Sequence, residues 1–184
     1  MLKLLAQLCF GLFGWKVIGR FPAGIWKSVV IVAPHTSNWD FIVGVIAAKI
    51  IDLKYRFLGK KEIFVPPFSA FFRWLGGIPV ERTKHTNLVD FVVDIFHKTD
   101  DLILGMSPEG TRKKINKWHS GFYYIAFKAK VPIVTVYMDY NKKEVGFGPV
   151  LNPSGDYLHD IEILRNFYRT ITAKYPENFE KEFE

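Results

Sequence analysis

Residues 34–40, PHTSNWD, contain a histidine and an aspartate whose spacing could support acid–base chemistry. His35 and Asp40 are five positions apart, so on one continuous helix their side chains would point about 140° away from each other. Pro34 and Ser37 instead indicate a turn followed by a helix start, with Asp40 in the first helical turn. In that geometry the loop folds back and brings the Asp40 carboxylate onto one nitrogen of the His35 ring.

A carboxylate in that place would make His35 a general base. It fixes the tautomer of the imidazole and stabilises the protonated ring, while the other nitrogen stays free to accept a proton. The pair has no nucleophile of its own and therefore suits the activation of a substrate hydroxyl. A structural alternative stays open, because Ser37 followed three residues later by Asp40 is also a capping box.

Residues 107–114, SPEGTRKK, form a second segment of interest directly after a predicted buried strand. Gly110 allows close approach of the backbone, Thr111 offers a hydroxyl, and Arg112 carries a planar guanidinium that suits a phosphate. A basic turn after a strand is also compatible with an ordinary solvated loop.

Two further cations follow short predicted strands. Lys60 comes after the strand expected at 55–58, and Arg82 follows the one expected at 78–80. Both could converge with Arg112 on a dianion. Alternatively, they form exposed charge pairs of little energetic consequence.

The elements that must position these residues alternate along the chain. Strands are expected at 28–33, 55–58, 78–80, 102–106 and 133–137, and helices at 40–51, 63–75, 87–97, 121–130 and 159–174. This alternation predicts a single α/β layered domain with a largely parallel sheet flanked by helices. Ligands usually bind such folds at the carboxyl ends of the strands, where both segments lie.

The amino terminus is the most apolar part of the chain. Leu4 to Trp15 is interrupted only by Gln7, and as a helix it would be about 18 Å long, against the ~30 Å hydrocarbon thickness of a bilayer. Lys16 and Arg20 follow, a pattern typical of a headgroup boundary. We expect residues 1–22 to form an interfacial helix and residues 23–184 the folded domain. A core helix is the alternative; a signal peptide is disfavoured because no small-x-small cleavage site follows.

Composition narrows the classes of ligand. The 184 residues carry a net charge of +7 and 16% aromatic residues, which together favour a membrane face, a lipid substrate or nucleic acid. The basic residues are scattered and no nucleic-acid-binding signature is present, so no nucleic acid is expected as partner. The single Cys9 excludes an internal disulfide and a cysteine-based zinc cluster, and the histidine spacing predicts no metal.

Two aromatic features allow more than one interpretation. One is a segment with five aromatic side chains, for which core packing is favoured over a groove for an acyl chain: Phe64, Phe68, Phe71, Phe72 and Trp74. The other is Trp118, which with Lys113, Lys114 and Lys117 is expected to form either a patch facing lipid headgroups or a solvated loop.

Four motifs in order resemble the glycerolipid acyltransferase family typified by 1-acylglycerol-3-phosphate acyltransferase. They are H-x4-D at 35–40, the segment 77–82, EGTR at 109–112 and VPIV at 131–134, and they span most of the middle of the chain. Two positions depart from the family pattern: Ser107 stands where phenylalanine is usual, and Glu81 where aspartate is usual.

The resemblance implies transfer of a fatty acyl group from an acyl-ACP or acyl-CoA thioester to the free hydroxyl of a lysophospholipid. The acceptor implied first is 1-acylglycerol-3-phosphate, which gives phosphatidic acid. His35 would be the base and Asp40 its orienting partner. The remaining matches would surround the glycerol phosphate: Lys60, Arg82, Glu109, Gly110, Thr111 and Arg112.

The same resemblance implies partners and location. Membrane lipids and a carrier-protein or coenzyme A thioester would be the partners, with no metal or prosthetic group. The protein would be peripheral or monotopic on the cytoplasmic face of a membrane. Two alternatives remain: a non-catalytic lipid-binding module, and an acyltransferase that acts on a different lipid acceptor.

Overall fold

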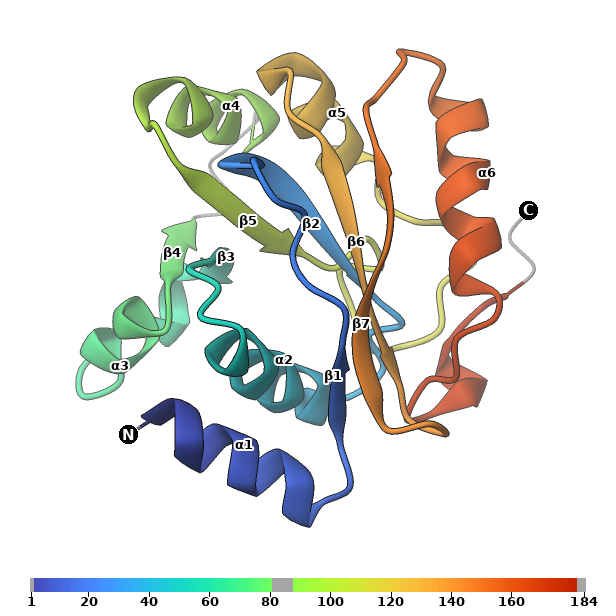
Figure 1. Cartoon of the computed structure of the whole chain (residues 1–184). Helices are drawn as coiled ribbons and strands as arrows, with labels where there is room; N and C mark the ends of the chain where they lie inside the picture. Colours follow the sequence, from blue (N-terminus) through green and yellow to red (C-terminus); the bar gives the residue numbers. More distant parts are fainter. Residues whose placement is uncertain (1, 81–87, 182–184) are drawn as a thin grey trace.

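A twisted seven-stranded sheet forms the centre of the computed structural model, which describes residues 2–80 and 88–181 (Figure 1). Its strand order is β1-β7-β6-β2-β5-β3-β4, and among these strands β6 and β7 pair antiparallel while the other neighbours pair parallel. The strands are β1 (Lys16–Ile18), β2 (Lys27–Ala33), β3 (Arg56–Lys60), β4 (Gly77–Val80), β5 (Leu102–Met106), β6 (Ile133–Asp139) and β7 (Glu144–Leu151). The predicted α/β domain with a largely parallel sheet is confirmed.

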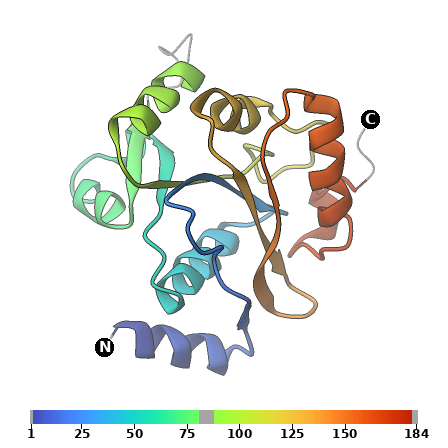
Figure 2. The same cartoon turned by 45° about the horizontal axis from the view of Figure 1, so that its top comes forward.

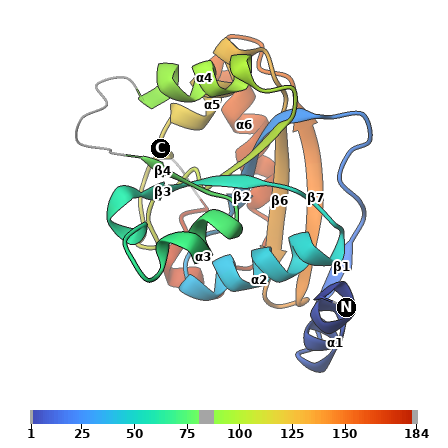
Figure 3. The same cartoon turned by 90° about the vertical axis from the view of Figure 1, so that its left-hand side faces the viewer.

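Helices cover both faces of this sheet. They are α1 (Leu2–Leu12), α2 (Asn38–Ile50), α3 (Ser69–Trp74), α4 (Leu88–Lys98), α5 (Gly121–Ala129) and α6 (Tyr157–Tyr168), with short 3-10 turns η1 (Lys61–Ile63) and η2 (Pro176–Asn178). Figure 3 shows α4 and α5 on one side of the sheet and α2 on the other. The two cores match this division, since one contains side chains of α4, α5 and α6 and the other those of α1 and α2.

Strand β2 lies inside the sheet and is covered on both faces. Val29 and Ile31 belong to the core beneath α4, α5 and α6, whereas Val30 belongs to the core beneath α1 and α2. A strand covered on both sides favours apolar side chains on both faces, which explains the uninterrupted apolar run VVIVA at 29–33. This strand ends at Ala33 and carries residues 34–40 to the carboxyl edge of the sheet.

Strands β1 and β7 were not expected from the sequence. β7 contains two glycines, which lower its strand propensity, but aromatic rings press on both of them. A Cβ at Gly146 would lie 2.6 Å from the Tyr137 ring, and one at Gly148 would lie 2.3 Å from Phe167. Close ring packing therefore requires glycine at these positions. β1 has three residues and pairs with β7.

The last helix was predicted at 159–174 but spans Tyr157–Tyr168. It begins earlier because Asp156 caps it by accepting the backbone N–H of His159. Beyond it the chain bonds to the neighbourhood of β2 and β6 instead of continuing the helix. The Thr172 carbonyl accepts from the Tyr140 N–H, and the Tyr175 N–H donates to Thr36 Oγ1.

The aromatic segment is only partly core: the favoured interpretation holds for Phe64 and is wrong for the exposed side chains. Its helix, α3, begins only at Ser69, after Pro66 and Pro67, and it lies beside the edge strand β4. At an edge a helix is covered from one side, and Phe68, Phe71 and Trp74 are exposed while Phe64 is buried. The alternative, a groove for an acyl chain, stays a prediction.

The amino-terminal helix α1 ends at Leu12, well short of residue 22, and the chain then enters the sheet as β1. Figure 2 shows α1 beside α2 at the margin of the domain. Phe10 is the buried side chain of α1, and its leucines at 2, 4, 5, 8 and 12 are 52–86% exposed. Among the residues described, no helix combines the length and apolar character needed to cross a bilayer.

Candidate active site

The loop after β2 brings His35 and Asp40 together. Ser37 is the N-cap of α2, and its hydroxyl accepts the Trp39 backbone N–H at 3.1 Å. Asp40 reaches back to the Ser37 N–H at 2.8 Å, which completes a capping box. The same Asp40 oxygen, Oδ2, lies 3.2 Å from His35 Nδ1. The capping box and the histidine contact are thus two functions of one carboxylate, not alternatives.

The two side chains differ in their access to solvent. The Asp40 side chain is 1% exposed, whereas that of His35 is 23% exposed. Within 2–80 and 88–181, no group is found bonded to His35 Nε2. One ring nitrogen is therefore held against a buried carboxylate, and the other is available to a substrate.

Asp40 stays ionised in spite of its burial. Burial by itself raises the pKa of Asp40, but contacts with His35 and Tyr140 and the Ser37 backbone bond outweigh it, so the pKa lies below its ordinary value. Oδ2 also accepts the Thr36 N–H at 2.8 Å, and Oδ1 accepts the Tyr140 hydroxyl at 2.6 Å. Asp40 can therefore stabilise a positive charge on the imidazole.

Glu109 joins the loop after β5 to the loop after β2. Its two oxygens accept the His35 backbone N–H at 3.0 and 3.1 Å, and one of them also accepts the Ser107 hydroxyl at 2.8 Å. Burial raises the pKa of Glu109, and the two hydrogen bonds oppose this only in part. Its carboxylate thus faces the His35 backbone, and the Ser107 that departs from the family pattern supplies a donor to it.

The next three residues lie at the surface. Gly110 has φ of +64°, and a Cβ there would lie 2.9 Å from Cδ2 of His119, so glycine suits both the backbone and the packing. Thr111 Oγ1 accepts the Lys113 N–H at 3.3 Å. Arg112 is exposed, and no carboxylate of the described part of the chain pairs with it. Its guanidinium is available to an anion.

Lys60 is the last residue of β3, which lies next to β5, and its side chain is exposed. Parallel pairing of β2, β5 and β3 places the ends of these strands, and so His35, Glu109 and Lys60, along one edge of the sheet. Arg82, the other expected cation, lies outside the described residues.

The expected headgroup-facing position of Trp118 was wrong. The side chain is 2% exposed and packs edge-on against Phe122 and Tyr168. The backbone next to Trp118 is held against the loop after β5, because the His119 N–H donates to the Pro108 carbonyl at 2.9 Å.

Sequence reasoning missed Tyr140, the residue that follows β6. The strand was expected to end at Tyr137, which left Tyr140 without a predicted place. In the structure β6 is the neighbour of β2, so the residue after β6 reaches the same edge as Asp40. Knowledge of the strand order would have identified it.

Taken together, this edge presents a partly exposed imidazole oriented by a buried, ionised carboxylate. The exposed guanidinium of Arg112 lies on the loop that Glu109 connects to the same histidine. Such an arrangement can remove a proton from a hydroxyl while an anionic group of the same molecule is held. Among the described residues, no three His, Cys, Asp or Glu side chains gather as a metal site.

Comparisons with known proteins give one family match and one match of the fold. The model of the family described as Acyltransferase matches residues 20–139. The search of curated proteins finds no match. Among solved structures, the chain is similar to the 1-acyl-sn-glycerophosphate (LPA) acyltransferase PlsC from Thermotoga maritima. The TM-score is 0.61 at 16% identity, with 89% of this chain and 73% of that chain covered.

Proposed function

The chain belongs to the acyltransferase family, and we propose that it moves a fatty acyl group from an acyl-ACP or acyl-CoA thioester to the free hydroxyl of a lysophospholipid. The proposed acceptor is 1-acylglycerol-3-phosphate, and the product is phosphatidic acid. The observation that carries the proposal is the 3.2 Å contact between His35 Nδ1 and Asp40 Oδ2. Glu109 connects the loop that holds this pair to its own loop, which also carries Arg112. The similarity to PlsC supports the fold, and the identity of that protein as a 1-acyl-sn-glycerophosphate acyltransferase motivates this choice of acceptor.

In the proposed reaction His35 Nε2 accepts the proton of the acceptor hydroxyl as its oxygen attacks the thioester carbonyl carbon. A C–O bond forms, the C–S bond then breaks, and the proton passes from His35 to the departing sulfur. Asp40 stabilises the transient imidazolium. A positioned base contributes about 10²–10⁴-fold to such a rate.

Acceptor recognition is assigned to the cations of the same edge. Arg112 can bind a phosphate through two parallel N–H···O bonds, and Lys60 adds a point charge. Arg82 joins this proposed set by its place in the motif. Gly110 and Thr111 offer a backbone amide and a hydroxyl in the same turn. Glu109 acts through His35 by holding its backbone.

We also propose that the enzyme works as a peripheral or monotopic protein on the cytoplasmic face of a membrane. The exposed leucines of α1 and the exposed aromatic side chains of α3 are supporting observations, because water-soluble proteins rarely leave large apolar patches uncovered. Lys16 and Arg20 follow α1 and suit anionic headgroups. The cytoplasmic face is where acyl thioesters would be supplied.

The experiment that tests the function is a matrix of donors and acceptors read by mass spectrometry of the lipid products. Purified protein is incubated with acyl-ACP or acyl-CoA and with lysophosphatidic acid or a different lysophospholipid. Formation of phosphatidic acid supports the proposal. Lipid binding without any acylated product would instead favour a non-catalytic lipid-binding module. Acylated product from a different lysophospholipid, and none from lysophosphatidic acid, would show that the proposed acceptor is wrong.

A further inference from the structure

Tyr140 contacts the buried carboxylate of Asp40 from the side opposite to the histidine. Its hydroxyl donates to Oδ1 at 2.6 Å, whereas Oδ2 lies against His35 Nδ1 and accepts the Thr36 and Ser37 amides. The two oxygens of Asp40 therefore have separate partners. Tyr140 comes from the turn between β6 and β7, 100 positions along the chain.

The ring of Tyr140 is held in place from several directions. Trp15 packs edge-on against this ring, with the two ring centroids 4.9 Å apart. The backbone N–H of Tyr140 donates to the Thr172 carbonyl at 2.9 Å. Lys174 Nζ lies 5.8 Å from the ring centroid. Burial and the adjacent carboxylate raise the pKa of Tyr140 well above its ordinary value, so the hydroxyl remains a donor.

The helix cap of α2 does not need this hydroxyl. The capping box uses Asp40 Oδ2 and the Ser37 side chain, and both of its bonds are present without Oδ1. Tyr140 adds a further restraint on the rotation of the carboxylate about its last side-chain bond, beside the Thr36 and Ser37 amides that hold Oδ2. That rotation decides whether Oδ2 faces the imidazole.

We propose that Tyr140 is a positioning residue of the transfer reaction, acting through Asp40 to hold His35 in the orientation that accepts the hydroxyl proton. This inference rests on the proposed acyl transfer. Three residues are then linked by contacts in the order Tyr140, Asp40 and His35, from the β6–β7 turn to the proposed base.

The charges around Asp40 predict how loss of the Tyr140 hydroxyl changes the pH profile of kcat/KM. His35 and Tyr140 contact Asp40 directly, and Glu109 is near enough to interact with it electrostatically. Lys174 lies over the Tyr140 ring, and Tyr175 interacts electrostatically with Tyr140. Removal of the phenol donor leaves more negative charge on Asp40, and this stabilises the protonated imidazole. The acidic limb of the pH profile of kcat/KM should then move to higher pH.

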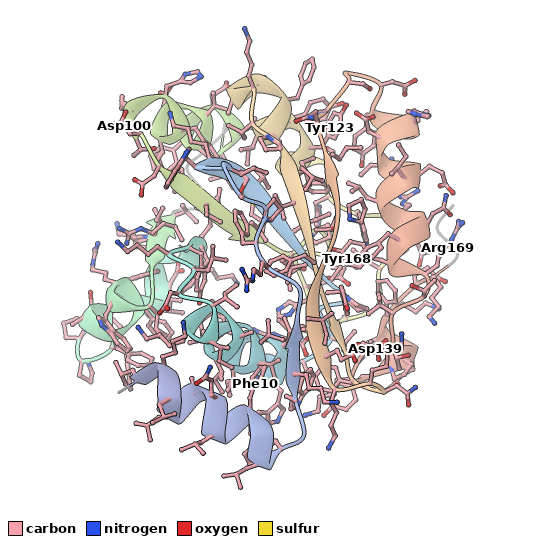
Figure 4. The ribbon with its side chains drawn as sticks, viewed as in Figure 1. Phe10, Asp100, Tyr123, Asp139, Tyr168 and Arg169 are labelled. Carbon is pink, nitrogen blue, oxygen red and sulfur yellow. The ribbon has the colours of Figure 1, made fainter. Side chains whose placement is uncertain are left out.

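The test is Tyr140→Phe, which removes the hydroxyl and keeps the ring against Trp15. We expect kcat to fall by roughly tenfold, less than the ~10²–10⁴ of the base itself, with little change in KM for lysophosphatidic acid. The matched control is Tyr123→Phe, whose hydroxyl donates to Asp160 at 2.7 Å. Figure 4 places Tyr123 at the opposite end of the molecule from Asp139, the neighbour of Tyr140. This control should leave kcat and the acidic limb unchanged.

A double substitution separates positioning from a general structural effect. In an Asp40→Asn background, Tyr140→Phe should change kcat by less than about twofold, because the residue it acts through is already altered. If Tyr140→Phe does not fold, incorporation of 3-fluorotyrosine at position 140 replaces it. Its more acidic phenol donates more strongly and should move the acidic limb to lower pH.

The outcomes distinguish this inference from the function on which it rests. A folded wild-type protein that forms no product with any donor and acceptor overturns the proposed function. Wild-type activity together with an unchanged kcat and an unchanged acidic limb in Tyr140→Phe, or in the fluorotyrosine protein, overturns the role of Tyr140 alone.

Discussion

The backbone N–H of His35 donates to both carboxylate oxygens of Glu109, at 3.0 and 3.1 Å, although the two residues are 74 positions apart. This bond links the end of β2 to the end of β5. It fixes the backbone of the proposed base to the loop that presents Arg112. A displacement of one loop would therefore be transmitted to the other.

Glu109→Gln should change how stability depends on pH. Burial raises the pKa of Glu109 above its ordinary value of 4.5, so the native state retains a proton that the unfolded state has lost. The free energy of unfolding therefore falls as pH rises through the window from 4.5 to the raised value. Urea titrations at several pH values should find this fall smaller in Glu109→Gln. The exposed Glu162→Gln is the control and should keep the wild-type slope; equal slopes in all three proteins would contradict the assignment.

Arg112→Ala should weaken the use of acceptors that carry a phosphate monoester. Loss of a charge-assisted bond costs about 1.5–3 kcal/mol, which corresponds to at least about a tenfold rise in KM for lysophosphatidic acid. Initial rates against acceptor concentration measure this. Lys113→Ala removes the neighbouring exposed charge and should change KM by less than about threefold. Similar effects of both substitutions would indicate a general electrostatic contribution and not a phosphate site.

Leu8→Asp should reduce binding to phospholipid vesicles without loss of the fold. Leu8 is 57% exposed on α1, and burial of such a side chain contributes about 1.5–3 kcal/mol. Cosedimentation with anionic vesicles should find at least about tenfold weaker binding. Leu158→Asp, at a leucine that is 77% exposed on α6, should bind as the wild type does. Equal loss in both variants, or in neither, would argue against α1 as the membrane contact.

Local sequence patterns predicted the elements in which each face is either largely buried or largely exposed. The run at 28–33 is buried on both faces, and α4 has one apolar and one polar face, so each matches its sequence period. β7 was missed because its glycines lower its strand propensity, and the local pattern does not show that rings from the neighbouring elements β6 and α6 require them. The exposure of α3 was missed because its sequence does not reveal that the sheet ends at β4.

The candidate site divides in the same way. The contact of His35 with Asp40 and the exposure of Arg112 follow from short-range signals, namely a turn before a helix cap and a glycine after a strand. The contacts of Tyr140 and of Glu109 join residues 100 and 74 positions apart. They depend on the strand order, which the sequence pattern leaves open.

The account depends most on His35 as the base that deprotonates the acceptor. His35→Ala removes the imidazole but keeps the backbone N–H that Glu109 accepts and leaves the capping box of α2 intact. We therefore expect a folded protein whose kcat for acyl transfer to lysophosphatidic acid is lower by about 10²–10⁴-fold. Turnover by His35→Ala at the rate of the wild-type protein, measured as phosphatidic acid formed per enzyme, would contradict it.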